Sequence, residues 1–253
     1  MTKISHISAV MIVKNAQNSI RETLKSLQLF QEVVIYDNGS TDKTKEIVNE
    51  FSNVVLIEGE FLGFGPTKNR AASYAKNSWI FSIDSDETLD EKLQQSLKTI
   101  KLDNKKLYTI QRTNFYKNQQ IKHCWGDDII IRLYNKEATS FTDKQVHEKI
   151  VSDGFQIQML QGLLNHYPYG SISDFIIKLD RYSTIYAQDN QGTKSSSPTK
   201  AFFNGLFSFT KTYFFKQGFR DGYAGLVIAF SHMATNFYKY IKLYELNKEL
   251  KRK

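Results

Sequence analysis

Over the first hundred residues, short apolar runs rich in β-branched residues alternate with polar stretches of helical period. The apolar runs predict strands at 7–13, 33–37, 54–57 and 79–84. The polar stretches predict helices at 19–29, 43–51 and 67–76, the last just after Pro66, a favoured first helical position. Because strands and helices alternate, we expect βαβ units and a parallel sheet. Later apolar segments predict that the sheet continues in mixed orientation, at 107–110 and 129–134.

The last third of the chain has a different pattern. A helix is predicted at 172–187, and the segment after it, Gln191–Lys200, reads QGTKSSSPTK, a composition that favours a mobile loop. The segment Ala201–Tyr244 then holds 14 of the chain's 34 aromatic residues, interleaved with lysine and arginine. We therefore divide the chain into an α/β domain at 1–170 and a helical, aromatic and basic region at 171–253.

The net charge of +8 is concentrated in this C-terminal region. Residues 171–253 hold 13 Lys and Arg against 6 Asp and Glu, whereas residues 1–170 hold 21 against 20. Aromatic rings interleaved with cations suit the headgroup zone of a membrane, so we expect an anionic membrane surface as a partner. The alternative is a set of helices that pack their rings on the rest of the protein. Acidic strand ends earlier in the chain oppose a nucleic-acid partner, and we expect none.

The sequence carries no recognisable signal for export. Charged and polar residues interrupt the first twenty positions, so we expect no signal peptide. The longest apolar run, Ala224–Phe230, is far shorter than the ~20 residues that cross a bilayer, and no transmembrane anchor is expected. A single cysteine, Cys124, allows no disulfide within the chain and favours a reducing compartment. We therefore expect a cytoplasmic protein.

Polar residues follow three of the predicted strands, at Lys14-Asn15, Asp37-Asn38-Gly39 and Asp84-Ser85-Asp86. In an open α/β sheet, ligands bind beyond the carboxyl ends of the strands, so these segments should meet at one edge. A carboxylate at the second strand end can accept hydrogen bonds from a uracil N–H or a ribose hydroxyl. The two aspartates of the third segment can reach one Mg²⁺ or Mn²⁺ ion, which would neutralise a diphosphate. Taken alone, an Asp-x-Asp after a strand is more often a solvated turn.

Four motifs in order carry a family resemblance: VMIVKNAQNSI at 10–20, VVIYDNGSTDKT at 33–44, KNRAA at 68–72 and FSIDSDE at 81–87. Together they resemble the family 2 inverting glycosyltransferases. The resemblance implies the GT-A fold, the Rossmann-like mixed α/β sheet of nucleotide-diphospho-sugar transferases, here followed by a C-terminal helical extension. It also implies that Asp37 binds uridine, that Asp84 and Asp86 bind metal and diphosphate, and that Lys68 and Asn69 approach the nucleotide.

A narrower resemblance continues to near the end of the chain. It rests on DDIIIRLYNK at 127–136, QVHEKI at 145–150, NHYPYGS at 165–171, KQGFRDGYAGLVIAF at 216–230 and YKYIKLYE at 238–245. These segments are similar to lipopolysaccharide-core glycosyltransferases of the β-1,4-glucosyltransferase type. The resemblance implies transfer of a hexose, expected to be glucose from UDP-glucose, to a lipopolysaccharide or lipooligosaccharide core sugar or a similar lipid-linked glycan. It places the protein at the cytoplasmic face of a bacterial inner membrane. Two features depart from the pattern, Lys14 and the Gln191–Lys200 loop.

An inverting transfer needs a base that deprotonates the acceptor hydroxyl, opposite the leaving diphosphate. Glu148 is the first candidate, with His147 as its orienting neighbour or a metal ligand, and Asp128 (or Asp127) is the alternative. Arg132 is expected either against the diphosphate or paired with a structural carboxylate.

His166 would complete the metal shell of Asp84 and Asp86, although a lone histidine among aromatic residues is more often a hydrogen-bonded core residue. Val13, Asn15 and Ser85 complete the expected nucleotide-sugar contacts. The rival hypothesis is a non-catalytic nucleotide-sugar-binding or membrane-adaptor protein of the same fold.

Overall fold

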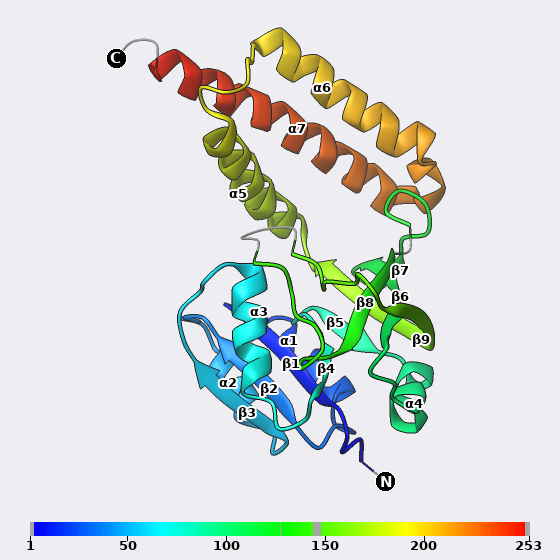
Figure 1. The fold of residues 1–253 in the computed structure, drawn as a ribbon. Coiled ribbons are helices and arrows are strands. Elements are labelled where there is room, and N and C mark those ends of the chain that lie inside the picture. The colour runs from blue at the N-terminus through cyan, green and yellow to red at the C-terminus, as the bar shows by residue number, and fades with distance from the viewer. Residues whose placement is uncertain (1–2, 127, 144–147, 251–253) are drawn as a thin grey trace. The chain divides into compact units, whose positions relative to one another are not determined.

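The computed structural model describes residues 3–126, 128–143 and 148–250, and its ribbon is drawn in Figure 1. The chain forms two compact units. The first comprises residues 1–113 and 128–166, and the second comprises residues 114–127 and 167–253. The second unit thus contains the helical region expected from residue 171 onward, together with a short segment from the middle of the chain.

A mixed sheet with the strand order β3-β2-β1-β4-β8-β6-β9-β5 forms the centre of the first unit, and β7 pairs with β6 (Figure 1). The strands β1, β2, β3 and β4 run parallel, and β8 joins β4 in the antiparallel direction. The strands are β1 (Ser8–Val13), β2 (Val33–Asp37), β3 (Val54–Glu58), β4 (Trp79–Ser82), β5 (Glu87–Leu89), β6 (Lys106–Tyr116), β7 (Gln119–Gln120), β8 (Asp128–Asn135) and β9 (Gln156–Tyr169).

Both faces of β1, β2 and β4 are buried, which explains their continuous apolar sequences. Met11 of β1 faces the cluster that includes buried residues of α1 (Ile20–Ser26), α2 (Thr44–Val48) and α4 (Glu91–Thr99). Val10, its neighbour in β1, faces the opposite cluster with Ala71 and Ala72 of α3 (Phe64–Ser73). Alternate side chains of one strand therefore contact different helix layers.

The predicted strands and helices of the first hundred residues are all present. β2 has the predicted bounds, and the other elements differ by a few residues at their ends. The third helix begins earlier than predicted, at Phe64, because Gly63 precedes it with a φ of 101° that L-residues rarely adopt. The pattern did not reveal β9, a 14-residue strand.

The second unit consists of helices around a small core. Its elements are α5 (Ile172–Asn190), α6 (Pro198–Thr210), a π-helix (Lys211–Phe215), a 3₁₀-helix (Gly218–Asp221) and α7 (Gly222–Leu250). α7 packs against both α5 and α6. Over the described residues, no helix has the length and apolar character needed to span a membrane.

The expected loop at Gln191–Lys200 is shorter than predicted, because Pro198 already begins α6. The remaining residues are attached to α7 by hydrogen bonds. Gln191 Nε2 donates to the Leu246 carbonyl, and Ser196 Oγ donates to the Tyr240 carbonyl. The segment therefore forms a defined connection between α5 and α6.

Candidate active site

Three strand ends meet at one edge of the sheet, in the order β2, β1, β4. Val13 at the end of β1 lies opposite Asp37 at the end of β2. On the other side of β1, Val10 lies opposite Ser82, and the Ile83 N–H donates to the Val10 carbonyl. The polar residues after β1, β2 and β4 therefore come together as the sequence predicted.

Over the described ranges, hydrogen bonds reach one of the two carboxylate oxygens of Asp37. Oδ1 accepts the backbone N–H groups of Gly39 and Ser40, at 2.9 and 2.8 Å. Oδ2 is buried and meets no hydrogen-bond donor among the described residues. A buried carboxylate oxygen without a donor is costly, so this atom is suited to a donor brought by a ligand.

Asn15 holds the β1 and β2 loops together. It adopts a left-handed conformation with a φ of 54°. Its N–H donates to Ser40 Oγ at 2.9 Å, and its Oδ1 accepts the Thr41 N–H at 2.8 Å. Asn15 thus fixes the turn that presents Asp37.

Asp84 lies between two cations. Its Oδ1 is 3.3 Å from Lys68 Nζ, and its Oδ2 is 2.6 Å from Arg132 Nη2. Although burial acts in the opposite direction, these two cations hold the pKa of Asp84 well below its ordinary value. Of the two alternatives for Arg132, its pairing with a carboxylate is observed. Ser85, next along the chain, accepts the Thr23 hydroxyl at its carbonyl.

Two residues that sequence reasoning missed complete this ion cluster. Glu87 is fully buried and pairs with Arg132 at 2.5 Å and with Arg112 at 3.3 Å. It also accepts the Asp84 N–H at 3.0 Å. The Nε–H groups of both arginines are buried and meet no acceptor among the described residues. The signal for Glu87 in the sequence was its place as the third carboxylate of the IDSDE run at 83–87. It was missed because a run of this kind is typical of a solvated turn.

Two of the candidate metal ligands, Asp86 and His166, lie close together, with 3.6 Å between Oδ2 and Nε2. The pairing of β5 with β9 brings them together, because Glu87 lies opposite His166. Within the described ranges, no three His, Cys, Asp or Glu side chains are grouped closely enough to hold a metal ion. One carboxylate and one imidazole fit part of a divalent-ion shell. Asp84 would join them only by giving up an ion pair.

Lys68 and Asn69 of α3 contact the segment that carries Glu148. Lys68 Nζ is 2.9 Å from Glu148 Oε1, and only about a tenth of the lysine side chain is exposed. The Asn69 amide donates to the Phe141 carbonyl and accepts the Phe141 N–H, both at 2.9 Å. Glu148 is therefore connected to Asp84 through a single ammonium group.

The other base candidates differ from Glu148 in their surroundings. Asp128 pairs with Arg112 at 2.8 Å and has a half-exposed side chain. His147 and Asp127 lie outside the described residues. Among the base candidates in the described part of the chain, Glu148 is the one that shares a cation with Asp84 itself, whereas Asp128 shares Arg112 with Glu87.

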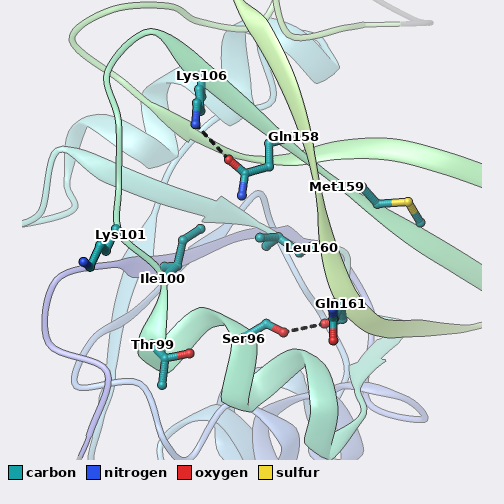
Figure 2. A pocket seen from close by; sticks show the side chains of 9 residues that line it. All are labelled: Ser96, Thr99, Ile100, Lys101, Lys106, Gln158, Met159, Leu160 and Gln161. Carbon is teal, nitrogen blue, oxygen red and sulfur yellow. Dashed lines mark hydrogen bonds between the residues drawn. The ribbon is translucent and has the colours of Figure 1, made fainter.

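A pocket of about 510 Å³ is lined by residues of α4, β6 and β9 and of the loop after α4 (Figure 2), none of which is a candidate site residue. Lys106, which lines the pocket, is the first residue of β6. Across the sheet it lies at the level of the start of β4, whereas the candidate site lies at the end of β4. The Lys106 side chain donates to Gln158, and Ser96 donates to the Gln161 carbonyl. This pocket therefore shares no residue with the candidate site.

Comparison with known proteins places the chain in a class. The model of the family "Glycosyl transferase family 2" matches residues 8–159, which is more than half of the chain. The chain therefore belongs to glycosyl transferase family 2, and its α/β topology agrees with the GT-A fold that the motifs predicted. The matched residues include every candidate site residue except His166.

Curated relatives extend the similarity beyond the family region. An uncharacterised glycosyltransferase of Rickettsia typhi is 30% identical over 95% of this chain and 87% of its own length. The lipopolysaccharide core biosynthesis glycosyltransferase LpsC of Rhizobium meliloti is 25% identical over 94% of this chain and 92% of its own length. Among solved structures, S. aureus TarS 1–349 in complex with UDP matches all of this chain and 92% of that chain, with 16% identity and a TM-score of 0.49.

Proposed function

We propose that this glycosyltransferase moves a hexose from a UDP-sugar to a sugar hydroxyl with inversion. The observation that carries the proposal is the buried Oδ2 of Asp37, which has no donor among the residues that the structure describes and lies at the strand edge shared with Asp84. A uracil N–H or a ribose hydroxyl supplies the donor that this oxygen lacks. Val13, opposite Asp37, and Asn15, which fixes the adjacent turn, complete the proposed nucleoside site.

The charges around Asp84 support a diphosphate as the neighbouring ligand group. Arg112 and Arg132 each keep a buried Nε–H without an acceptor among the described residues. Planar guanidinium groups bind phosphate oxygens with good geometry. The Asp84–Asp86 segment, including Ser85, would face the diphosphate, as its family resemblance implies.

A divalent ion, Mg²⁺ or Mn²⁺, is part of this proposal. Asp86 and His166 would hold it, and Asp84 would join them on releasing Lys68 or Arg132. When bound, the ion neutralises charge that develops on the leaving diphosphate. Glu87, which accepts the Asp84 N–H and is paired with Arg112 and Arg132, would keep Asp84 in position.

Glu148 is the proposed base. In an in-line displacement it takes the proton of the acceptor hydroxyl, the acceptor oxygen forms a bond to the anomeric carbon of the donor sugar, and the bond from that carbon to the diphosphate oxygen breaks, releasing UDP. Its support is the 2.9 Å contact with Lys68, the residue that also contacts Asp84. His147 would orient it, and Asp128 is the alternative base, already engaged by Arg112.

The proposed donor is UDP-glucose, and the proposed acceptor is a lipid-linked glycan such as a lipopolysaccharide or lipooligosaccharide core sugar. Support comes from the similarity to LpsC over nearly the whole chain. The expected location is the cytoplasmic face of a bacterial inner membrane.

An anionic membrane surface is the proposed partner of the second unit. Many large apolar side chains of its helices are exposed, among them Phe203, Phe207 and Phe215 at 60%, 60% and 72%. Lys194 and Lys239 lie over the Tyr186 ring, and neither pairs with a carboxylate of the described residues. Burial lowers the pKa of Lys239, so a nearby anion would favour its charged form. Exposed rings beside unpaired cations are typical of interfacial binding.

A UDP-release assay separates this proposal from the rival non-catalytic adaptor. The protein is incubated with a panel of UDP-sugars, Mn²⁺ and truncated core oligosaccharides. We expect acceptor-dependent UDP release that is largest with UDP-glucose and lost in Glu148→Gln. An adaptor would bind the nucleotide and release no UDP with any donor.

A further inference from the structure

Lys68 and Asn69 are the two residues expected to approach the nucleotide. Their closest described contacts are with Glu148 and with the backbone of Phe141, respectively. Asn69 forms two hydrogen bonds with the backbone of Phe141, in the manner of a strand partner. Phe141 in turn forms an isolated β-bridge with Ile150, two residues after Glu148. Asn69 therefore anchors the Phe141–Ile150 bridge, and with it the described segment 148–150 that carries Glu148.

Lys68 makes a second connection between α3 and this segment. Its ammonium group lies 2.9 Å from Glu148 and 3.3 Å from Asp84, with the Phe141 ring centroid at 5.2 Å. The Glu148 side chain is 16% exposed and the Lys68 side chain 10%. A buried ammonium requires such partners, because an unpaired buried charge is strongly unfavourable. The lysine therefore holds both carboxylates in a defined arrangement.

We propose that Lys68 is the positioning residue for Glu148, and that Asn69 anchors the segment carrying this glutamate. The inference rests on the proposed function of Glu148 as the base. A cation at this distance orients the carboxylate, because a charge-assisted hydrogen bond fixes one of its oxygens. Because the same ammonium group contacts Asp84, the proposed base and the proposed diphosphate site share one side chain.

The competing role for Lys68 is direct binding of the nucleotide. The two roles predict different kinetics, since a nucleotide contact changes UDP affinity, whereas a positioning residue changes turnover. The two roles also differ in how the effects of replacing Lys68 and Glu148 combine. A residue that acts only through Glu148 has no further effect once Glu148 has been replaced.

The test compares Lys68→Met, Lys68→Arg, Glu148→Gln and the double variant Lys68→Met/Glu148→Gln. UDP affinity is measured by titration calorimetry, and kcat is measured with UDP-glucose and a core oligosaccharide. For Lys68→Met we expect UDP affinity within about threefold of the wild type and a kcat at least ~100-fold lower. Lys68→Arg should recover most of the lost turnover. The double variant should be no slower than Glu148→Gln.

Arg70→Met is the matched control, because Arg70 is an exposed cation on the same helix. Its kcat and UDP affinity should equal those of the wild type.

If thermal melting shows that Lys68→Met does not fold, Asn69→Leu takes its place in the same double-variant comparison, with the same expected loss of turnover. Lost UDP affinity in Lys68→Met, or additive losses in the double variant, would overturn the positioning role. A fully active Glu148→Gln enzyme would overturn the base assignment and with it this inference.

Discussion

At the scale of single residues, the two oxygens of the Asp37 carboxylate have different roles. Oδ1 fixes the turn after β2, whereas Oδ2 is buried without a hydrogen-bond donor from the part of the chain that the structure describes, and we propose that it binds the ligand. Asp37→Asn keeps one oxygen and replaces the other with an amide. We expect UDP affinity to fall at least about tenfold, because a hydrogen bond to a charged group contributes ~1.5–3 kcal/mol. Calorimetry checks this, with Asp42→Asn on the following turn as a control of unchanged affinity.

His232 gives the second unit a pH-dependent stability. Trp125 Nε1–H donates to its Nε2 at 3.3 Å, and Thr212 Oγ1 lies 3.0 Å from its Nδ1. Since the indole can only donate, the ring is neutral with its proton on Nδ1. Burial, with repulsion from Lys216 and Lys239, lowers the pKa of His232 to about 4.

The folded pKa of His232 therefore lies below that of the unfolded chain. The contribution of the neutral His232 ring to the free energy of unfolding is therefore fully present above pH 6.5. It is lost as the pH falls towards 4, by up to about 3 kcal/mol. Urea unfolding followed by tryptophan fluorescence at pH 7.5 and 4.5 measures this. The wild type should lose more stability than His232→Gln over this range. Equal losses in the two proteins would contradict the assignment.

At the scale of elements, the close approach of the 3₁₀-helix to α7 depends on Gly225. A Cβ at this position would lie 1.8 Å from the Gly218 carbonyl oxygen. We expect Gly225→Ala to destabilise the second unit by about 1–3 kcal/mol, because backbone has to move to admit the methyl group. Gly170→Ala is the control, since its Cβ would meet the Asp174 side chain only at 3.5 Å. A melting temperature of Gly225→Ala equal to that of the control would contradict the prediction.

The elements also differ in how well the sequence predicted them. Buried parallel strands such as β2 have continuous apolar sequences, and their ends locate Asp37 and Asp84. β9 has mostly exposed residues in its first half and contains Pro168, so it shows no clear alternation. The burial of Glu87 depends on this strand and on Arg132, both distant in sequence. Local pattern therefore predicted the edge of the site, whereas its ion cluster required the tertiary pairing.

At the scale of the whole molecule, the second unit is expected to attach the enzyme to anionic membranes. Phe214 and Phe215 of the π-helix are 54% and 72% exposed. Replacing both with serine should lower binding to phosphatidylglycerol vesicles at least about tenfold, because each ring contributes more than ~1 kcal/mol on entering the interface. UDP release with a water-soluble acceptor should be unchanged.

Vesicle sedimentation checks the membrane prediction. Ile157→Ser, at an exposed apolar position of the first unit, is the matched control and should bind as the wild type does. Raising the salt concentration should weaken binding if the lysines contribute. Equal binding of wild type and the double serine variant would mean that these rings pack against protein, the alternative stated for this region.

The central claim is that the edge formed by β2, β1 and β4 binds a UDP-sugar. A crystal structure of the protein with UDP and Mn²⁺ tests it most directly. We expect a uracil or ribose donor on Asp37 Oδ2, the diphosphate beside Arg132, and Mn²⁺ between Asp86 and His166. UDP bound elsewhere, with Asp37 Oδ2 still unpartnered, would contradict it.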